Sequence, residues 1–172
     1  AIVSVEVNHA RAVLIGANAR RLGIGSIRVV GADAARLPFA PGALFDRVMV
    51  DPPCSGLGVI RRNPEIKWRL APADLVQLAD VQRRVLTAAA DFVRPGGALV
   101  YSVCTINPDE GAGVVEAFLA SDGRFEAFDL GRLFGEGGAP YIENGAVFSS
   151  PDRFADDGAI PDGFYIARLR RR

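Results

Sequence analysis

The sequence predicts an α/β protein built on a mainly parallel, doubly wound sheet. Along its first two thirds, short apolar segments alternate with segments of helical spacing, a pattern typical of strands joined by crossover helices. Four of the predicted strands are followed closely by an acid or a cysteine. The chain has 172 residues, of which 49% are hydrophobic and 23% are charged, so it can form one domain with a buried core.

The first fifty residues are predicted to contain three strands and one helix. Residues 1–7 are an apolar strand that includes an acid near its end. Residues 10–22 have apolar positions near helical spacing, and Gly23 then stops the helix. Residues 26–30 form a second short strand, and residues 47–50 form a third.

The rest of the chain continues the alternation and then changes character. Its expected elements are a turn-rich loop over 52–64, a helix over 72–93, a tight turn over 94–97, a strand over 98–103, a helix over 107–121 with acids in its first turn, and antiparallel strands within 125–172, the last over 163–169. The sequence therefore predicts a parallel sheet extended by antiparallel C-terminal strands.

Polar groups lie where the predicted strands end, at Glu6, Asp33, Asp51 and Cys104. Ligands of open parallel sheets bind beyond the carboxyl ends of the strands. The two oxygens of Glu6 suit a ribose diol, and Asp33 could accept from an adenine amino group. The alternatives are a capping or surface acid at Glu6 and an Asx turn at Asp33.

The two cysteines of the chain stand in short, distinctive segments. Cys54 belongs to Asp51-Pro52-Pro53-Cys54-Ser55-Gly56, in which the prolines fix the path of the backbone. Cys104 ends the predicted strand in Tyr-Ser-Val-Cys-Thr, close to the positive end of the helix expected next, an environment that favours a thiolate. Both cysteines could instead be small, inert core residues.

Charge and composition limit the possible partners. Lys plus Arg and Asp plus Glu each number 20, so the formal net charge is zero, whereas nucleic-acid binders usually have a basic excess. Basic residues nevertheless form two clusters, Arg61, Arg62, Lys67 and Arg69, and Arg168, Arg170, Arg171 and Arg172. Each cluster could contact phosphates or could be a solvated charged edge.

The chain has one His and no Cys-x-x-Cys pattern, so no metal is expected. It has no bilayer-length apolar run and no signal peptide pattern, so no membrane partner and a cytoplasmic location are expected.

These motifs resemble the Fmu/Sun (Nop2/Sun-type) family of RNA cytosine-5 methyltransferases, which includes bacterial ribosomal RNA enzymes. Residues 51–68 resemble the signature loop of the family, which more often has Ala in place of the first proline. Residues 101–105 resemble its second cysteine motif. Glu6, Asp33 and residues 163–165 also fall where the family pattern expects them.

The resemblance implies a role for each candidate residue. Cys104 would be the nucleophile, Cys54 would assist release of the product, and Asp51 would contact the cytosine ring. Glu6 and Asp33, with Asp51 nearby, would hold S-adenosylmethionine. The RNA substrate implied is ribosomal RNA, 16S ribosomal RNA in particular, with transfer RNA as the second candidate.

The resemblance also implies a Rossmann-like methyltransferase fold, with residues 1–172 as a single partial catalytic domain. The first strand of that fold and its glycine-rich loop are expected to be missing, because the sequence opens at what should be the second strand. We therefore expect a fragment of a longer protein, with weak cofactor binding by the isolated 172 residues.

The chemistry of cytosine explains why two thiols and an acid are needed. Carbon 5 is a poor nucleophile until a thiolate adds to carbon 6 and turns the ring into an enamine. An acid near ring nitrogen 3 stabilises the charge that develops there. The target base must also be flipped out, and residues 61–69 could contact phosphates. Trp68 in that loop could be an aromatic surface, although a packing role is the stronger expectation.

Three other functions stay open from the sequence. An amino-group methyltransferase could use Asp51-Pro52-Pro53, but such loops stack an aromatic residue on the base where this chain has Cys54. A non-catalytic RNA-binding fragment would bind RNA without either cysteine. A structural remnant would have no activity.

Overall fold

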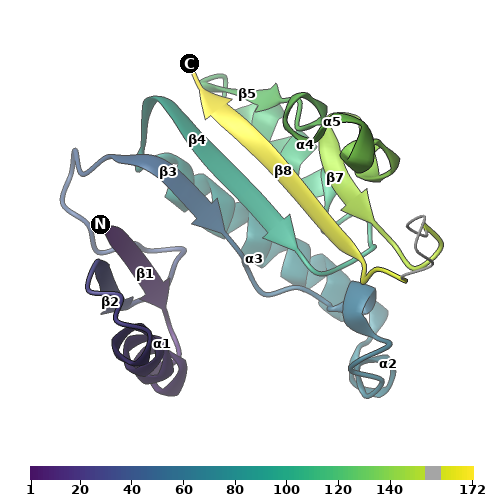
Figure 1. Cartoon of the computed structure of the whole chain (residues 1–172), viewed down its shortest axis with the longest axis horizontal. Helices are drawn as coiled ribbons and strands as arrows, with labels where there is room; N and C mark the ends of the chain where they lie inside the picture. Colours follow the sequence, from purple (N-terminus) through teal and green to yellow (C-terminus); the bar gives the residue numbers. More distant parts are fainter. Residues whose placement is uncertain (154–159) are drawn as a thin grey trace. The chain divides into compact units, whose positions relative to one another are not determined.

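The computed structural model describes residues 1–153 and 160–172. These residues form two compact units, Ala1–Ala43 and Leu44–Arg172, both drawn in Figure 1. Residues 154–159, which belong to the predicted C-terminal strand region, lie outside the described residues. The prediction that residues 1–172 make up one domain stays a prediction.

The first unit is a βαβ element. Strand β1 (Ile2–Glu6) pairs in parallel with β2 (Ile27–Gly31), and α1 (His9–Arg21) connects them. Asn8 caps the helix, because its side chain accepts a hydrogen bond from the backbone N–H of Arg11 at 3.1 Å. All three elements lie within two residues of the predicted ranges, and the parallel pairing agrees with the predicted fold class.

The second unit contains a mixed sheet with the strand order β3-β4-β8-β7-β6. Its strands are β3 (Phe45–Val50), β4 (Val93–Val103), β8 (Phe164–Arg171), β7 (Ala146–Ser149) and β6 (Ile142–Glu143), with β5 (Phe125–Phe128) paired to β8. Strand β4 is parallel to β3 and antiparallel to β8, which runs beside it through the centre of the sheet in Figure 1. The predicted change from parallel to antiparallel strands is confirmed.

Two helices of the second unit pack together, and the longer one contacts β3 and β4. Helix α3 (Pro72–Ala90) begins where the Asp74 carboxylate accepts the backbone N–H of Ala71 at 2.8 Å. Helix α4 (Ala112–Ser121) lies against α3. Leu86 and Leu99, one from α3 and one from β4, are completely buried. Burial of each such side chain contributes about 2 kcal/mol to folding.

Two predicted elements need correction. The tight turn expected over 94–97 is a bulge inside β4, where the register with β3 shifts and Gly96 has φ of +76°. The helix expected over 107–121 begins only at Ala112, because Gly111 before it is not helical (φ −96°, ψ −102°) and packs closely against the Tyr165 ring. The acids therefore do not lie in the first turn of α4.

The C-terminal region also contains helical segments that the sequence did not predict. Helix α5 (Gly131–Gly138) is followed by a short 3₁₀ turn, η2 (Ala139–Tyr141). Four glycines in the eight residues of α5 conceal it, because glycine is among the poorest helix formers. The loop after β3 likewise contains a 3₁₀ turn, η1 (Leu57–Val59), and a four-residue helix, α2 (Ile66–Arg69).

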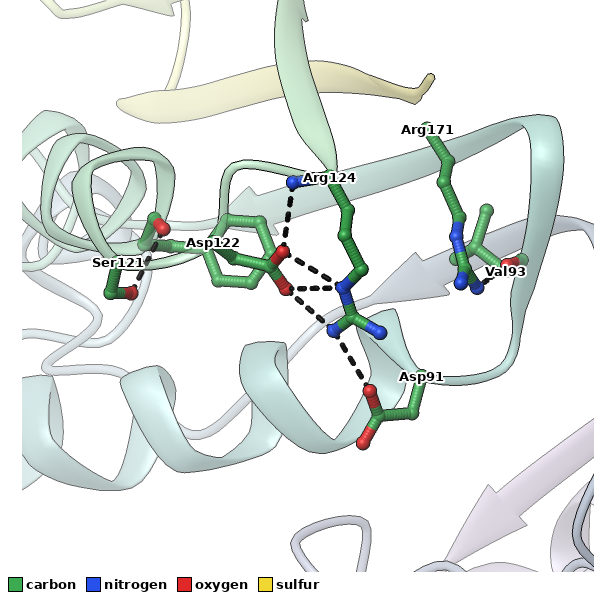
Figure 2. A network of polar contacts seen from close by, with 7 residues as sticks. Asp91, Val93, Ser121, Asp122, Arg124 and Arg171 are labelled. Carbon is green, nitrogen blue, oxygen red and sulfur yellow. Dashed lines mark hydrogen bonds and ion pairs between the residues drawn. The ribbon is translucent and has the colours of Figure 1, made fainter.

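Figure 2 shows a polar network that joins the end of α3 to the segment before β5. The Arg124 guanidinium donates to the Asp122 carboxylate and also to Asp91, with Nε–Oδ1 and Nη2–Oδ1 distances of 2.8 Å each. Arg124 thereby lowers the pKa of Asp122. In the same view, Arg171 near the end of β8 donates to the carbonyl oxygen of Val93 at the start of β4. None of the helices within 1–153 and 160–172 combines the length and apolar character needed to cross a bilayer.

Candidate active site

The Cys54 loop and the Cys104 loop leave adjacent strands at the same edge of the sheet. Strands β3 and β4 are parallel, and Val50 is the register partner of Tyr101. Asp51 follows β3 directly, and Cys104 follows β4 directly. Parallel strands end on one side of a sheet, so the fold itself brings the two loops together.

The two sulfur atoms are in contact. The Sγ atoms of Cys54 and Cys104 lie 3.3 Å apart, and both cysteines are free and half-buried. Neither residue is therefore one of the fully buried, inert cysteines that the sequence left as an alternative. The roles implied for the two cysteines require both sulfurs in one site, and the structure places them next to each other. The roles of the two cysteines stay predictions.

Contact between the sulfurs makes the two thiols chemically different. The hydrogen bond between the two thiols lowers the pKa of Cys104 to about 7, although burial and the Asp51 carboxylate act in the opposite direction. The same hydrogen bond, together with burial, raises the pKa of Cys54 strongly. Of the two thiols, Cys104 is the one that loses its proton more easily. The hydrogen bond between the sulfurs takes the place of the helix terminus that the sequence suggested, because α4 begins only at Ala112.

The third candidate of this unit is the carboxyl group of Asp51. Burial raises its pKa, so the group is more easily protonated than an ordinary aspartate. A carboxyl group with a raised pKa can give or share a proton, as an acid near a ring nitrogen must do. The structure places Asp51 three residues before Cys54, in the loop that carries the sulfur pair.

A buried carboxylate, Glu110, lies behind the cysteines and was not among the predicted site residues. It is completely buried and accepts hydrogen bonds from Ser55, Gln82, Thr105 and Asn107. From the sequence it was one of two acids expected in the first turn of a helix. Glu110 faces the interior because α4 begins at Ala112 and not at residue 107. No local pattern in the sequence predicts this later start.

Two glycines join both cysteine loops to the start of β8. The backbone N–H of Gly58 donates to the Cys104 carbonyl oxygen at 3.1 Å, and that of Gly163 donates to the Gly58 carbonyl oxygen at 2.7 Å. A Cβ atom on Gly58 would lie only 1.9 Å from the Gly163 oxygen. The two backbones can approach this closely because neither residue has a side chain.

Replacement of Gly58 by alanine is therefore expected to lower the free energy of unfolding by about 3 kcal/mol, because a backbone segment must move to admit the methyl group. Chemical denaturation followed by circular dichroism would measure the loss. Gly123→Ala is the matched control, since a Cβ atom there meets nothing within 4 Å, and we expect a change of no more than about 0.5 kcal/mol. Equal stabilities of the two variants would show that the close approach is unimportant.

The first unit brings its two candidate residues to one edge. Glu6 ends β1, and its register partner Gly31 ends β2, two residues before Asp33. Glu6 Oε1 accepts from the Asn8 N–H at 2.7 Å and from Arg11 at 2.9 Å. The Arg11 hydrogen bond is the main reason that the pKa of Glu6 is lowered. A carboxylate has about four acceptor positions, so Glu6 retains capacity for a ribose hydroxyl.

Asp33 is also engaged locally, as the alternative interpretation of the sequence suggested. Its Oδ1 accepts from the backbone N–H of Ala35 at 2.9 Å, which is an Asx turn. This bond fixes the carboxylate just beyond β2 and leaves the second oxygen chemically able to accept from an amino group. The residues of this unit thus fit the ribose and adenine of a nucleoside cofactor.

The loop between η1 and α3 has an exposed aromatic residue. Trp68 lies on α2 and is 81% exposed, so the expectation that it packs in the core was wrong. The Lys67 ammonium lies 5.0 Å from the centre of its ring. A helix of four residues has too few neighbouring side chains to cover an indole. The Trp68 ring and the Lys67 ammonium are therefore both accessible to a ligand.

The other basic residues are partly used by the fold. Arg61 and Arg62 both pair with Asp162, with N–O distances of 3.6 Å and 2.8 Å. At the C-terminus, Arg168 stacks 4.0 Å from the centre of the Phe128 ring. Contacts within the fold therefore engage part of the positive charge of both clusters, which the sequence had left open between phosphate contacts and solvated edges.

Comparison with known proteins decides the family. The model of the family described as "16S rRNA methyltransferase RsmB/F" matches residues 1–170. The chain belongs to this family. The resemblance on which the sequence predictions depended is thereby confirmed, and so is the methyltransferase fold.

Individual members of the RsmB/F family match along most of the chain. It is similar to the ribosomal RNA small subunit methyltransferase B of Sodalis glossinidius (strain morsitans), at 42% identity over 69% of this chain and 28% of that protein. It is also similar to the probable ribosomal RNA small subunit methyltransferase B of Bacillus subtilis (strain 168), at 34% identity over 99% of this chain and 38% of that protein. The chain thus spans roughly a third of the length of these two relatives.

Solved structures support the same assignment. NSun6 from Pyrococcus horikoshii, crystallised with SFG, is 28% identical and superposes with a TM-score of 0.80 over 99% of this chain and 41% of that one. PH0851 superposes with a TM-score of 0.85 at 29% identity, over 99% of this chain and 37% of that one. The arrangement of strands described above is therefore that of a Rossmann-like methyltransferase.

Proposed function

We propose that this chain carries the chemical step of RNA cytosine-5 methylation, in which a methyl group passes from S-adenosylmethionine to carbon 5 of a cytosine. The 3.3 Å contact between the Cys54 and Cys104 sulfurs at the carboxyl ends of β3 and β4 is the observation that carries the proposal. Relatives named as small subunit ribosomal RNA methyltransferases support 16S ribosomal RNA as the substrate. Transfer RNA is the second candidate. We expect the reaction in the cytoplasm, where bacterial ribosomal RNA lies.

Cys104 begins the reaction as the nucleophile. Its thiolate adds to carbon 6 of the flipped cytosine, forming a sulfur–carbon bond while the electrons of the carbon 5–carbon 6 double bond move toward ring nitrogen 3. A pKa near 7 supplies a large thiolate fraction at neutral pH. The Asp51 carboxyl group, whose pKa is raised by burial, shares its proton with nitrogen 3 and stabilises the charge.

S-adenosylmethionine, when bound, supplies an electrophilic methyl group that carbon 5 can accept. Glu6 and Asp33 would hold its ribose and adenine. Carboxylates suit these contacts because hydroxyl and amino groups both donate hydrogen bonds. SFG in the NSun6 crystal shows that a relative binds a ligand of its own, and the donor and acceptor chemistry of this chain fits a nucleoside.

Cys54 completes the cycle. The hydrogen bond with Cys104 is the main cause of the raised pKa of Cys54, and this effect ends when the Cys104 sulfur is bonded to carbon. Cys54 then releases its own proton to solvent more easily, and the resulting thiolate can take the proton from carbon 5. The electrons of that carbon–hydrogen bond restore the ring double bond, and the Cys104 thiolate is expelled.

RNA would contact the exposed face of α2 and its neighbours. Trp68 offers an aromatic surface on which an unstacked base can rest, and Lys67 and Arg69 supply positive charge for phosphates. The formal net charge of the chain is zero, so these local groups must provide most of the attraction.

Identification of the product nucleoside tests the proposal. Unmodified 16S ribosomal RNA would be incubated with the protein expressed from its natural gene and with methyl-labelled S-adenosylmethionine, then digested to nucleosides and separated. We expect the label to elute with 5-methylcytidine. Label in N4-methylcytidine would establish an amino-group methyltransferase instead, and RNA binding without label would establish a non-catalytic fragment.

A further inference from the structure

Glu110 contacts the residue that follows each of the two cysteines. Its Oε1 accepts from the backbone N–H of Ser55 at 2.8 Å, and its Oε2 accepts from the Thr105 hydroxyl at 3.2 Å. Ser55 comes directly after Cys54, and Thr105 comes directly after Cys104. One carboxylate therefore holds the two loops whose sulfurs are in contact.

The same carboxylate is connected to the residue before Cys54. The Gln82 amide on α3 donates to Glu110 Oε1 at 3.0 Å and to the carbonyl oxygen of Pro53 at 2.9 Å. The backbone on both sides of Cys54 is thus tied to Glu110, directly through Ser55 and indirectly through Gln82. Three residues in a row are fixed, so the Cys54 side chain has little freedom to move away from its partner.

The environment of Glu110 is built for a carboxylate. The residue is 0% exposed, and so is Gln82. Four donors bond to its two oxygens, the fourth being the Asn107 amide at 3.4 Å from Oε2, while the Tyr101 hydroxyl bonds to its backbone oxygen at 2.6 Å. A charged group taken out of water costs stability unless donors surround it in this way.

We propose that Glu110 is a positioning residue that sets the Cys54–Cys104 sulfur contact by holding the residue after each cysteine. It acts on the reaction through the contact between the two sulfurs, because the proposed role of Cys104 as the thiolate requires a hydrogen bond from Cys54. The charged and titratable groups that act on Cys104 are Cys54, Asp51 and Glu110 itself. This inference depends on the proposed role of Cys104 as the nucleophile.

The pH dependence of Cys104 alkylation tests the proposal without RNA. Only two cysteines are present in the sequence, so peptide mass spectrometry assigns the site of iodoacetamide modification. A thiol reacts as its thiolate, so the rate rises with pH and is half-maximal at the pKa. In Glu110→Gln, one carboxylate oxygen becomes an N–H₂ group that faces donors, the loops separate, and the midpoint for Cys104 is expected to rise by about one pH unit.

A double-mutant cycle separates positioning from a general structural effect. Cys54→Ala removes the donor and should raise the midpoint by itself. In a Cys54→Ala background, Glu110→Gln should produce no further rise, and the loss of a nearby negative charge should lower the midpoint slightly. A rise of equal size in both backgrounds, or no rise in Glu110→Gln alone, would overturn the proposal.

Two further variants serve as controls for the Glu110→Gln result. Asp109→Asn removes the exposed neighbouring carboxylate and should leave the midpoint unchanged. If Glu110→Gln does not fold, Gln82→Met removes the amide link between Glu110 and Pro53 and should give a smaller rise of the same sign; no rise would count against the proposal. Methylation by Glu110→Gln should fall about 100-fold in kcat with little change in KM, as for a misplaced catalytic group.

The two proposals fail in different ways. If the native protein produced no 5-methylcytidine but Glu110→Gln still raised the midpoint, the proposed function would be wrong and the positioning role would stand. If the product were 5-methylcytidine and the midpoint did not move, only the positioning role would be lost.

Discussion

Replacement of Cys104 by alanine is expected to abolish methyl transfer, with kcat/KM falling by about 10⁴-fold or more, as for other enzymes that lose a covalent nucleophile. Without a bond between sulfur and carbon 6, carbon 5 of cytosine remains too poor a nucleophile to accept the methyl group. A fall of this size corresponds to about 5 kcal/mol of lost transition-state stabilisation. Single-turnover transfer of labelled methyl groups to 16S ribosomal RNA would measure it.

Controls must show that the variant is folded and binds RNA. Cys104 is only half-buried, so the alanine variant should unfold within about 1 kcal/mol of the native protein and should retain its affinity for RNA. Cys104→Ser keeps the shape of the side chain but has a hydroxyl group that does not ionise near neutral pH, so it should be as inactive as the alanine variant. An alanine variant with more than a few per cent of native activity would show that Cys104 is not the nucleophile.

The strand ends could be predicted from the sequence because their signals are local. An apolar run followed by an acid or a cysteine marks the end of a strand, and β1, β2 and β3 were each placed within two residues. Parallel pairing then brings Asp51 and Cys104 to one edge without any knowledge of side-chain contacts.

Residues whose position depends on distant parts of the chain could not be predicted. Glu110 is buried because Gly111 interrupts the helix and packs on Tyr165, which lies 54 positions further along in β8. An acid in this turn would be exposed on a regular helix. The prediction that Trp68 packs against other residues failed for a related reason. Burial of an indole requires neighbouring side chains on both of its faces, and the short helix α2 does not provide them.

The start of β8 links the two cysteine loops in a way that local patterns do not show. Gly163 binds to Gly58, and Gly58 binds to the carbonyl oxygen of Cys104. The segment at residues 163–165 is therefore a structural partner of the site. Glycine is needed at position 163 because a Cβ atom there would lie 2.7 Å from the Gly58 Cα. Backbone contacts of this kind position the loops and leave the side chains of Cys54 and Cys104 free to react.

The second large effect concerns Cys54. If this thiol takes the proton from carbon 5, its replacement should leave the first half of the reaction possible and block the second half. Loss of the donor raises the pKa of Cys104 and so lowers its thiolate fraction at pH 7.5, and incubation at pH 9 restores part of the thiolate. Adduct formation should therefore continue, while expulsion of Cys104 should slow by a factor of about 10²–10⁴, the usual contribution of a positioned general base.

Cys54→Ala is thus expected to accumulate a covalent complex with RNA that survives denaturing electrophoresis. End-labelled RNA incubated with S-adenosylmethionine and the variant should migrate with the protein, and protease digestion should release it. Two matched variants serve as controls. The double variant Cys54→Ala, Cys104→Ala should form no complex, because the sulfur that bonds to carbon 6 is gone. Ser55→Ala should form no more complex than the native protein, because both thiols remain. Full turnover by Cys54→Ala at pH 9 with no trapped RNA would mean that another group removes the proton, and Cys54 would then be only the hydrogen-bond donor that keeps Cys104 ionised.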